Sequence, residues 1–292
     1  MNPKIDYHFV SVIIPTINRN SLPIVLEALQ KQTREPDEII VMEDKNHLGP
    51  SIMRNQGIEK SKGDLIAFLD DDNVPEKNWL EIFINEINKY KADGVSSNYS
   101  EEDQFLDEIR QRRNYPEEVI INPNGFFGLG GNCMYRKVRL EECKRQDSFI
   151  FNPKIKITQD VELALRMRSH GFKLVYVINN VRHLKKLNPI EFIIFQFHRG
   201  TGITNLYVLR NSYKNIGLGP GLLWDDSARK HPIKKWFFTF WQRILGPFDY
   251  KSFSKFRYFI LFWMGEKAKA LGFLFSILST KISERGRSDR PT

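Results

Sequence analysis

The sequence predicts an α/β fold, with a Rossmann-like, mostly parallel sheet flanked by helices and an α-helical C-terminal extension. Three observations support this class. Short apolar runs alternate with segments whose apolar residues recur every three to four positions, as strands and helices do around a parallel sheet. The chain has 292 residues, 41% of them hydrophobic, which is enough for one large domain and an appendage. The early strands end in polar or acidic residues, and parallel strands present such ends at one edge.

The first three strand and helix pairs are expected before residue 90. Strands are predicted at residues 9–15, 38–42 and 64–69, because each is a short apolar or β-branched run bounded by polar residues. Helices are predicted to begin after Ser21, at Gly49-Pro50 and at Pro75, where capping or breaking residues precede apolar residues at helical spacing. Strands and helices in this order imply right-handed crossovers within a parallel sheet.

The next hundred residues are less regular. We predict helices at residues 101–113, 137–144 and 159–168 and strands at residues 133–135 and 173–178. Glu162 and Arg166 are spaced for an ion pair on one helix. Residues 125–131 include four glycines, so this loop either lets the backbone approach another group closely or is a flexible connection.

An acidic triplet follows the third predicted strand. Asp70, Asp71 and Asp72 are adjacent in the sequence, and two carboxylates about 4 Å apart repel by roughly 4 kcal/mol near a protein surface. A solvated turn is one explanation, because Asp and Asn favour turns. The preceding strand favours a metal or phosphate site instead, since ligands bind beyond the carboxyl ends of parallel strands and carboxylate oxygens suit Mg²⁺ or Mn²⁺.

The ordered motifs together resemble the inverting glycosyltransferases of family 2, which have the GT-A fold. The resemblance spans about residues 10 to 183 and rests on residues 12–19, 38–44, 54–57, 63–72, 130–132 and 159–160. It implies metal-dependent transfer of a sugar from a nucleotide-diphosphate sugar, with UDP favoured, to a hydroxyl group. The acceptor would be lipid-linked or a polysaccharide, and the anomeric carbon would be inverted.

The resemblance also implies roles at the reacting centre. Asp160 matches the catalytic base, although an Asp at the first turn of a helix also suits an N-cap. Asp72 matches a ligand of Mn²⁺ or Mg²⁺, and Asp70 and Asp71 would share the ribose and metal contacts. His183 matches a third metal ligand, although a His after a strand is equally a structural residue.

Substrate contacts follow from the same resemblance. The acceptor site would be floored by Gly130, Gly131 and Asn132. Two departures from the family pattern matter. Residues 43–46 replace the commoner Asp-Asp-x-Ser, which leaves open whether the nucleobase of the donor is uracil or guanine. Gln159 replaces a Glu, and the loss of this negative charge should make the neighbouring Asp160 carboxyl group more acidic. The nucleotide sugar would be bound by Pro15, Thr16, Arg19, Asp44, Arg54, Asp70 and Asp71.

The C-terminal region, residues 189–292, is predicted as a helical part that follows a GT-A domain at residues 1–188. Residues 229–292 contain 14 Lys and Arg but only 4 Asp and Glu, and they also contain 15 of the 37 aromatic residues. No apolar run reaches the roughly 20 residues that span a membrane. We therefore expect residues 229–292 to lie on an anionic membrane surface, with packing on the catalytic domain as the alternative. Nucleic acid is not expected as a partner. Residues 198–202 are predicted to break a helix, with closure of the glycine-flanked Arg199 over the diphosphate as the alternative.

Two other functions remain open from the sequence. Residues 69–74 also resemble the motif of haloacid-dehalogenase-type phosphatases, in which Asp70 would be the phosphorylated nucleophile. A non-catalytic membrane-binding module with a transferase-like fold is the other alternative. The amino end lacks an apolar signal segment and the two cysteines match no disulfide or zinc pattern. We expect a cytoplasmic location, on the inner face of the cell membrane.

Overall fold

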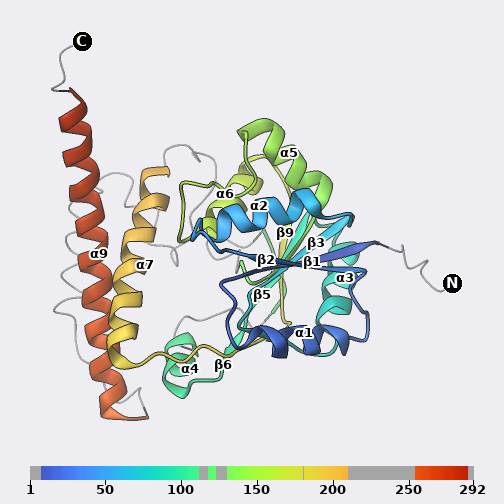
Figure 1. Cartoon of the computed structure of the whole chain (residues 1–292), viewed down its shortest axis with the longest axis horizontal. Helices are drawn as coiled ribbons and strands as arrows, with labels where there is room; N and C mark the ends of the chain where they lie inside the picture. Colours follow the sequence, from blue (N-terminus) through green and yellow to red (C-terminus); the bar gives the residue numbers. More distant parts are fainter. Residues whose placement is uncertain (1–7, 112–117, 123–129, 180, 210–253, 289–292) are drawn as a thin grey trace. The chain divides into compact units, whose positions relative to one another are not determined.

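The computed structural model describes residues 8–111, 118–122, 130–179, 181–209 and 254–288 (Figure 1). They belong to two compact units, Met1–Lys185 and Lys186–Thr292. The first unit holds a mixed α/β arrangement, and the described part of the second unit is helical. Of the predicted glycine loop at residues 125–131, residues 125–129 lie outside the described residues, and so do residues 229–253 of the predicted membrane-binding segment at 229–292.

A seven-stranded sheet forms the centre of the first unit, in the order β2-β1-β3-β8-β5-β9-β7. β1, β2, β3, β5 and β9 run in the same direction, whereas β8 and β7 are antiparallel to their neighbours. The predicted, mostly parallel α/β sheet is therefore confirmed. The strands are β1 (Val10–Thr16), β2 (Glu38–Glu43), β3 (Leu65–Leu69), β5 (Gly94–Ser97), β7 (Ile120–Ile121), β8 (Asn132–Arg136) and β9 (Leu174–Val177).

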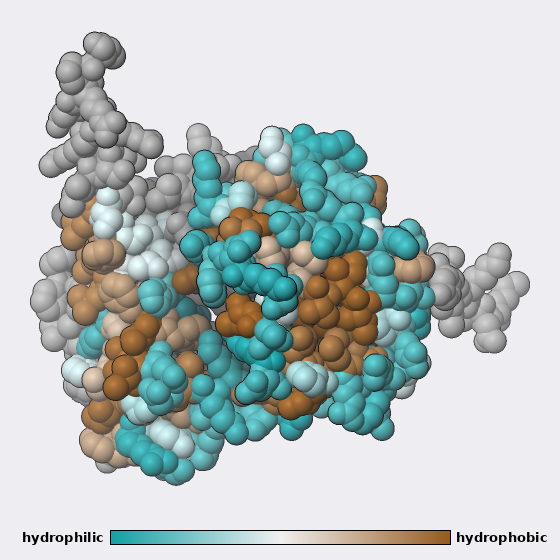
Figure 2. Space-filling model, viewed as in Figure 1, coloured by the Kyte–Doolittle hydropathy of each residue, from teal (hydrophilic) through white to brown (hydrophobic). Residues whose placement is uncertain are grey.

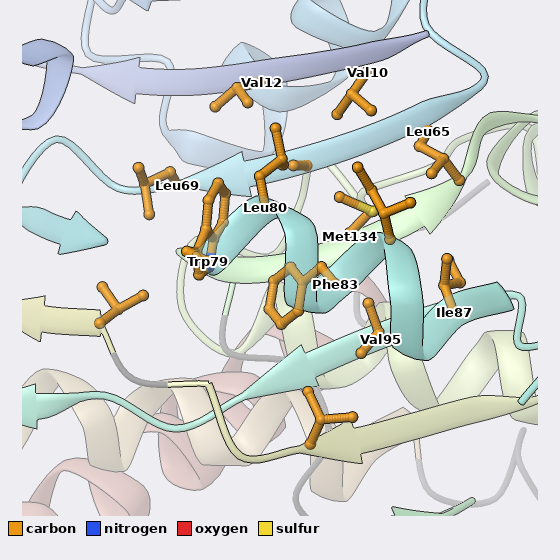
Figure 3. Packing of buried hydrophobic residues seen from close by; sticks show 14 of the residues in the cluster. Val10, Val12, Leu65, Leu69, Trp79, Leu80, Phe83, Ile87, Val95 and Met134 are labelled. Atoms are coloured by element: carbon orange, nitrogen blue, oxygen red, sulfur yellow. The ribbon is translucent and has the colours of Figure 1, made fainter. Parts of the chain in front are cut away.

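Helices cover both faces of this sheet (Figure 1). Along β1, Val12 and Ile14 belong to one buried cluster and Ile13 to the other, because successive strand residues point to opposite faces. Figure 3 shows the first cluster, in which Trp79 and Phe83 of a helix pack against apolar strand residues. The helices on that face are α1 (Leu22–Gln30) and α3 (Trp79–Lys89), and those on the other are α2 (Pro50–Lys60), α5 (Lys137–Asp147) and α6 (Gln159–Ser169).

A second, smaller sheet has three short strands in the order β4-β10-β6. They are β4 (Asn73–Pro75), β10 (Val181–His183) and β6 (Ser100–Glu101). In the register of this sheet, the middle strand sets His183 opposite Asn73 on one side and Glu101 on the other. This pairing brings three distant parts of the chain together directly after the acidic triplet.

Two predicted helices begin later than expected. The helix predicted from Pro75 begins at Trp79, because residues 73–75 pair as a strand. The polar helix predicted from Glu101 is α4 (Gln104–Gln111), because Glu101 pairs as the end of β6. The predicted helix after Ser21 has Ser21 at its N-cap position, but the Ser21 side chain makes no capping hydrogen bond.

The described part of the second unit consists of α7 (Pro189–Leu209) and α9 (Phe256–Ser288), which pack along each other. The break predicted at residues 198–202 is wrong, because α7 is continuous there. Gly200 serves packing instead, since a Cβ at this position would lie 1.9 Å from the backbone oxygen of Lys269. Across the described residues, we find no helix with the length and apolar character needed to span a membrane.

Candidate active site

The edge of the large sheet collects polar residues from several strands. β1 ends at Thr16 and the parallel β3 ends at Leu69, so the acidic triplet follows at the same edge. β8 runs in the opposite direction, and its first residue, Asn132, pairs with Leu69. The Gly130-Gly131 turn before β8 therefore reaches the same place as the triplet.

The Asp71 carboxylate connects two loops at this edge through hydrogen bonds. Its side chain is buried, with 1% exposed. One carboxylate oxygen accepts a hydrogen bond from the Thr16 hydroxyl at 2.5 Å, and the other accepts one from Arg19 Nη1 at 2.5 Å. The same Arg19 nitrogen lies 3.1 Å from Asp72 Oδ2. Arg19 thus compensates part of the repulsion within the triplet and ties the loop after β1 to the loop after β3.

Asp70 pairs with a buried arginine from α2. Arg54 Nη2 donates to Asp70 Oδ1 at 2.8 Å, while Arg54 Nε and Nη1 are buried without a hydrogen-bond partner among the described residues. Gly131 allows this arrangement, because a Cβ there would lie 2.3 Å from Asp70 Cγ. Burial raises the pKa of Asp70 in spite of the Arg54 charge. Buried donors that lack a partner are rare, so Arg54 has capacity to bind an anion.

Asp160 meets the same glycine turn from α6. Its Oδ2 accepts a hydrogen bond from the backbone N–H of Gly130 at 2.8 Å. A Cβ on Gly130 would lie 3.1 Å from Asp160 Cβ and 3.1 Å from Arg54 Cζ, so these two side chains flank the turn. The N-cap position of α6 belongs to Thr158, and the alternative role of Asp160 as an N-cap is wrong. The Asp160 carboxylate is therefore directed toward the loop at the sheet edge.

His183 bridges two carboxylates in the small sheet. His183 Nε2 lies 3.5 Å from Asp72 Oδ2, and His183 Nδ1 lies 2.6 Å from Glu101 Oε2. Burial lowers the pKa of His183, but the interactions with the Asp72 and Glu101 carboxylates outweigh burial and raise the pKa to about 9. Burial raises the pKa of Asp72, and the contacts with His183 and Arg19 reverse this, so its pKa is lowered.

The Asp72 and His183 side chains fit a divalent cation. Two ligands of one six-coordinate ion lie roughly 3 Å apart when each is about 2.1 Å from the ion, which is close to the observed 3.5 Å. Mg²⁺ and Mn²⁺ sites often use one or two protein ligands and complete their shell with water and substrate phosphates. Among the described residues, Asp70 does not join these two in a group of ligand atoms within 4.8 Å of one another, and its carboxylate pairs with Arg54 instead.

A second group of potential metal ligands lies elsewhere in the first unit. In the described parts of the chain, Cys143, Asp147 and His170 have ligand atoms within 4.8 Å of one another. However, Asp147 Oδ2 already accepts from His170 Nε2 at 2.8 Å and from Arg166 Nη1 at 3.0 Å. Burial also raises the pKa of Cys143 to about 12. Arg166 is therefore the cation of this group, which we call the Arg166 cluster: Cys143, Asp147, Glu162, Arg166 and His170.

Two residues that are predicted to contact the nucleotide, Asp44 and Pro15, also have structural roles within the protein. Asp44 follows β2, and its carboxylate accepts the backbone N–H groups of Leu48 at 2.8 Å and Gly49 at 2.7 Å. Asp44 therefore shapes the loop that begins α2. Pro15 is buried within β1, next to Thr16. Their contacts with a nucleotide stay predictions.

The side chain of Asn132 also forms hydrogen bonds within the protein interior. Its Oδ1 accepts from Trp79 Nε1 at 2.8 Å, and its Nδ2 donates to the backbone oxygen of Asn98 at 2.5 Å. Asn132 thus anchors the start of β8, and the predicted contact of residues 130–132 with an acceptor stays a prediction.

Glu101 is the residue of this site that the sequence analysis missed. The surrounding residues, 101–113, are polar and have helical spacing, so they were assigned to one helix. A two-residue strand is too short to show alternation. Only its pairing with β10 reveals that Glu101 faces His183.

Comparison with known proteins supports the resemblance. Residues 42–143 match the family model described as Glycosyl transferase family 2. An uncharacterized glycosyltransferase of Rickettsia bellii (strain RML369-C) is 34% identical over 34% of this chain and 18% of its own length. One of Haemophilus influenzae (strain ATCC 51907 / DSM 11121 / KW20 / Rd) is 33% identical over 23% of this chain and 31% of its own length. The chain thus spans less than a third of each of these relatives.

A solved structure is also similar. The crystal structure of S. aureus TarS has a TM-score of 0.47 and 15% sequence identity, over 90% of this chain and 54% of TarS. A TM-score below 0.5 supports no further comparison. The family match includes Asp44, Arg54, the acidic triplet and the Gly130-Gly131 turn, but it ends before Asp160 and His183.

Proposed function

We propose that this chain, whose residues 42–143 match the model of glycosyl transferase family 2, transfers a sugar from a nucleotide-diphosphate sugar to a hydroxyl group, with inversion at the anomeric carbon. One observation carries the proposal. Asp160 and the Arg54–Asp70 pair meet at the Gly130-Gly131 turn, on the sheet edge where Asp72 approaches His183. A carboxylate that can act as a base is thus close to groups that can bind a diphosphate.

Asp160 is the proposed base. The acceptor oxygen attacks the anomeric carbon from the face opposite the diphosphate, and the bond from that carbon to the diphosphate oxygen breaks. Asp160 takes the proton of the attacking hydroxyl group. The Gly130 N–H holds one oxygen of the Asp160 carboxylate at 2.8 Å, and a carboxylate held through one oxygen can accept a proton on the other. The glycine turn would floor the acceptor site.

The leaving diphosphate gains negative charge, and the site offers positive charge to receive it. The Nε and Nη1 atoms of Arg54 are buried and have no hydrogen-bond partner among the described residues. Arg19, with 45% of its side chain exposed, lies against Asp71 and Asp72 at the rim. Asp72 and His183 would hold Mn²⁺ or Mg²⁺, which when bound stabilises the leaving charge as a Lewis acid. Asp70 would contact the donor from its pair with Arg54.

The nucleotide would lie over the ends of β1 and β2. Pro15 and Thr16 end β1, Arg19 lies in the loop after β1, and Asp44 directly follows β2. The Asp44 carboxylate would accept a hydrogen bond from the nucleobase in addition to those from the two loop amides. We favour UDP as the donor nucleotide. Uracil and guanine both offer N–H donors, so a direct comparison of the two nucleotides is required.

The experiment is a donor screen with the full chain and Mn²⁺. A UDP-sugar should raise the melting temperature more than a GDP-sugar, and turnover should release UDP in the presence of a hydroxyl acceptor. If no nucleotide sugar binds, the proposal fails. Binding without turnover on any acceptor would favour the non-catalytic module, and phosphate release from an aryl phosphate would favour the phosphatase.

We also propose that the second unit attaches the enzyme to an anionic membrane surface on the cytoplasmic side, where a lipid-linked or polysaccharide acceptor is made. Hydrophobic side chains reach the surface of this unit (Figure 2). Five of them recur along α9 at spacings of three, four and seven residues and so form one stripe, which also carries the cation Lys267. Their exposed fractions are 37% for Ile260, 40% for Met264, 56% for Leu271, 60% for Phe275 and 57% for Leu278.

Co-sedimentation with lipid vesicles tests this attachment. The full chain should bind vesicles that contain phosphatidylglycerol, and Leu271→Gln with Phe275→Gln should weaken binding about tenfold or more, because two large apolar side chains are lost from the interface. Val138→Gln on α5 is the matched control, since Val138 is 54% exposed in the first unit. Equal binding by all three proteins would refute the proposal.

A further inference from the structure

His183 has one close carboxylate partner and one distant one. Its Nδ1 lies 2.6 Å from Glu101 Oε2, which is the length of a strong, charge-assisted hydrogen bond. Its Nε2 lies 3.5 Å from Asp72 Oδ2, which is beyond the usual range for such bonds. Glu101 is therefore the residue that holds the ring, and the looser contact with Asp72 leaves room for a third group.

The backbone of the small sheet keeps these three side chains in place. The Glu102 N–H donates to the His183 carbonyl at 3.0 Å, and the Leu184 N–H donates to the Asp72 carbonyl at 2.8 Å. The ring of Tyr99 packs edge-on against His183, with the ring centroids 5.1 Å apart. The His183 ring is thus fixed by strand pairing, by an aromatic neighbour and by a carboxylate on Nδ1.

A carboxylate on one ring nitrogen decides what the other can do. Hydrogen bonding of Nδ1 to Glu101 keeps a proton on Nδ1, so loss of the other ring proton leaves the lone pair of the imidazole on Nε2. Histidines that bind metals usually donate their second N–H to a carboxylate or carbonyl group in this way, and loss of such a partner weakens metal binding about 10- to 100-fold. Glu101 suits this role, because its side chain is only 8% exposed.

We infer that Glu101 is a positioning residue, which fixes the proton of His183 on Nδ1 and presents Nε2, together with Asp72, to the divalent cation. The inference rests on the proposed metal-dependent transfer, but it concerns a residue outside the acidic triplet and outside the predicted ligands. Glu101 would act on the cation only through His183.

Mn²⁺ binding to the full chain tests the role of Glu101 without any measurement of turnover. Electron paramagnetic resonance gives the Mn²⁺ dissociation constant, and pulsed spectra detect the nitrogen of a directly bound imidazole. Glu101→Leu should raise the dissociation constant about 10- to 100-fold and weaken the nitrogen signal. Glu101→Gln keeps an acceptor for the Nδ1 proton and should fall between Glu101→Leu and the unmodified chain.

Glu102→Gln is the matched control, because it removes the same charge from the next residue. Its dissociation constant should stay within about threefold of the unmodified chain. Two outcomes would overturn the inference: equal weakening by Glu101→Gln and Glu102→Gln, which indicates bulk charge alone, or an unchanged nitrogen signal in both Glu101 variants. If the unmodified chain binds no Mn²⁺, the metal-dependent function fails as well, so the two failures can be told apart.

Discussion

The sheet-edge cluster (Arg54, Asp70, Asp72, Glu101, Asp160 and His183) and the Arg166 cluster contain the same kinds of side chain. In the Arg166 cluster, Arg166 donates to Glu162 at 2.9 Å and to Asp147 at 3.0 Å, and His170 lies 2.8 Å from the same Asp147 oxygen. Its guanidinium also reaches the Phe149 and Ile150 carbonyl oxygens. The charges there are matched within the protein.

The sheet-edge cluster is not matched in this way. Arg54 Nε and Nη1 lack hydrogen-bond partners among the described residues, and His183 Nε2 lies 3.5 Å from Asp72 Oδ2. A buried charge network that is closed on itself stabilises the fold, whereas one that keeps unused donors and acceptors can bind a ligand. The difference lies in the geometry and not in the residue types.

The largest expected effect is on turnover. Asp160→Asn should lower kcat by about 10³-fold, because the amide cannot take the proton of the acceptor hydroxyl group. Asp147→Asn should leave kcat within about twofold, since the Arg166 cluster has no part in the reaction. Initial rates of UDP release compare the two. An Asp160→Asn enzyme with more than a tenth of the original kcat would contradict the assignment.

The Arg166 cluster should also hold an unreactive thiol. Burial raises the pKa of Cys143 to about 12, so at pH 8 the thiolate is roughly 10³-fold rarer than for a free cysteine with a pKa near 8.5. Burial likewise raises the pKa of Cys133 to about 12. Alkylation of the native protein should therefore be slow at pH 8 and speed up as pH rises. As a control, urea-unfolded protein should be alkylated quickly at pH 8. Equally rapid alkylation of the native protein at pH 8 would contradict this prediction.

Stability should respond more to Arg166 than to Arg54. Arg166→Met leaves Glu162, which is 0% exposed, without its cation, and such a change costs about 3–5 kcal/mol in free energy of unfolding. Arg54→Met should cost less, because Asp70 keeps 37% of its side chain exposed to water. Urea unfolding measures both. Equal losses would show that the sheet-edge pair is as closed as the Arg166 cluster.

The smallest effect concerns Gly131. A Cβ at this position would lie 2.3 Å from Asp70 Cγ, so Gly131→Ala should displace the Asp70 carboxylate. Overpacking of this kind costs about 1–3 kcal/mol, and donor affinity should fall together with stability. Thermal unfolding and calorimetric titration of the donor measure the two effects. An Ala variant with unchanged donor affinity would remove Gly131 from the site.

The sequence predicted the sheet and the place of the triplet because both depend on local patterns. Apolar runs defined β1, β2 and β3, and the acidic residues directly after β3 indicated the sheet edge at which the candidate site lies. The helix break at residues 198–202 was wrong, because Gly200 serves close packing against α9, a contact between residues nearly 70 positions apart. Local propensity carries no information about such a distant neighbour.

Within the site, single residues were easier to predict than their partners. Asp160, Asp72 and His183 could be proposed from motifs, but the pairing of Arg54 with Asp70 and of Glu101 with His183 depends on tertiary contacts. The Glu101 contact spans 82 positions in the chain and arises from a two-residue strand. No periodicity in the sequence marks so short a strand, so only the fold reveals it.

The most direct test of the account is the affinity for a UDP-sugar in the presence of Mn²⁺, measured by calorimetry for Asp72→Asn and Asp160→Asn. Asp72→Asn should weaken binding about 10-fold or more, because it removes a carboxylate that would hold the cation needed to stabilise the negative charge of the diphosphate. Asp160→Asn should bind within about threefold of the unmodified chain and yet fail to turn over. Equal loss of donor binding in both variants would contradict the division between a donor-binding pair and a catalytic base.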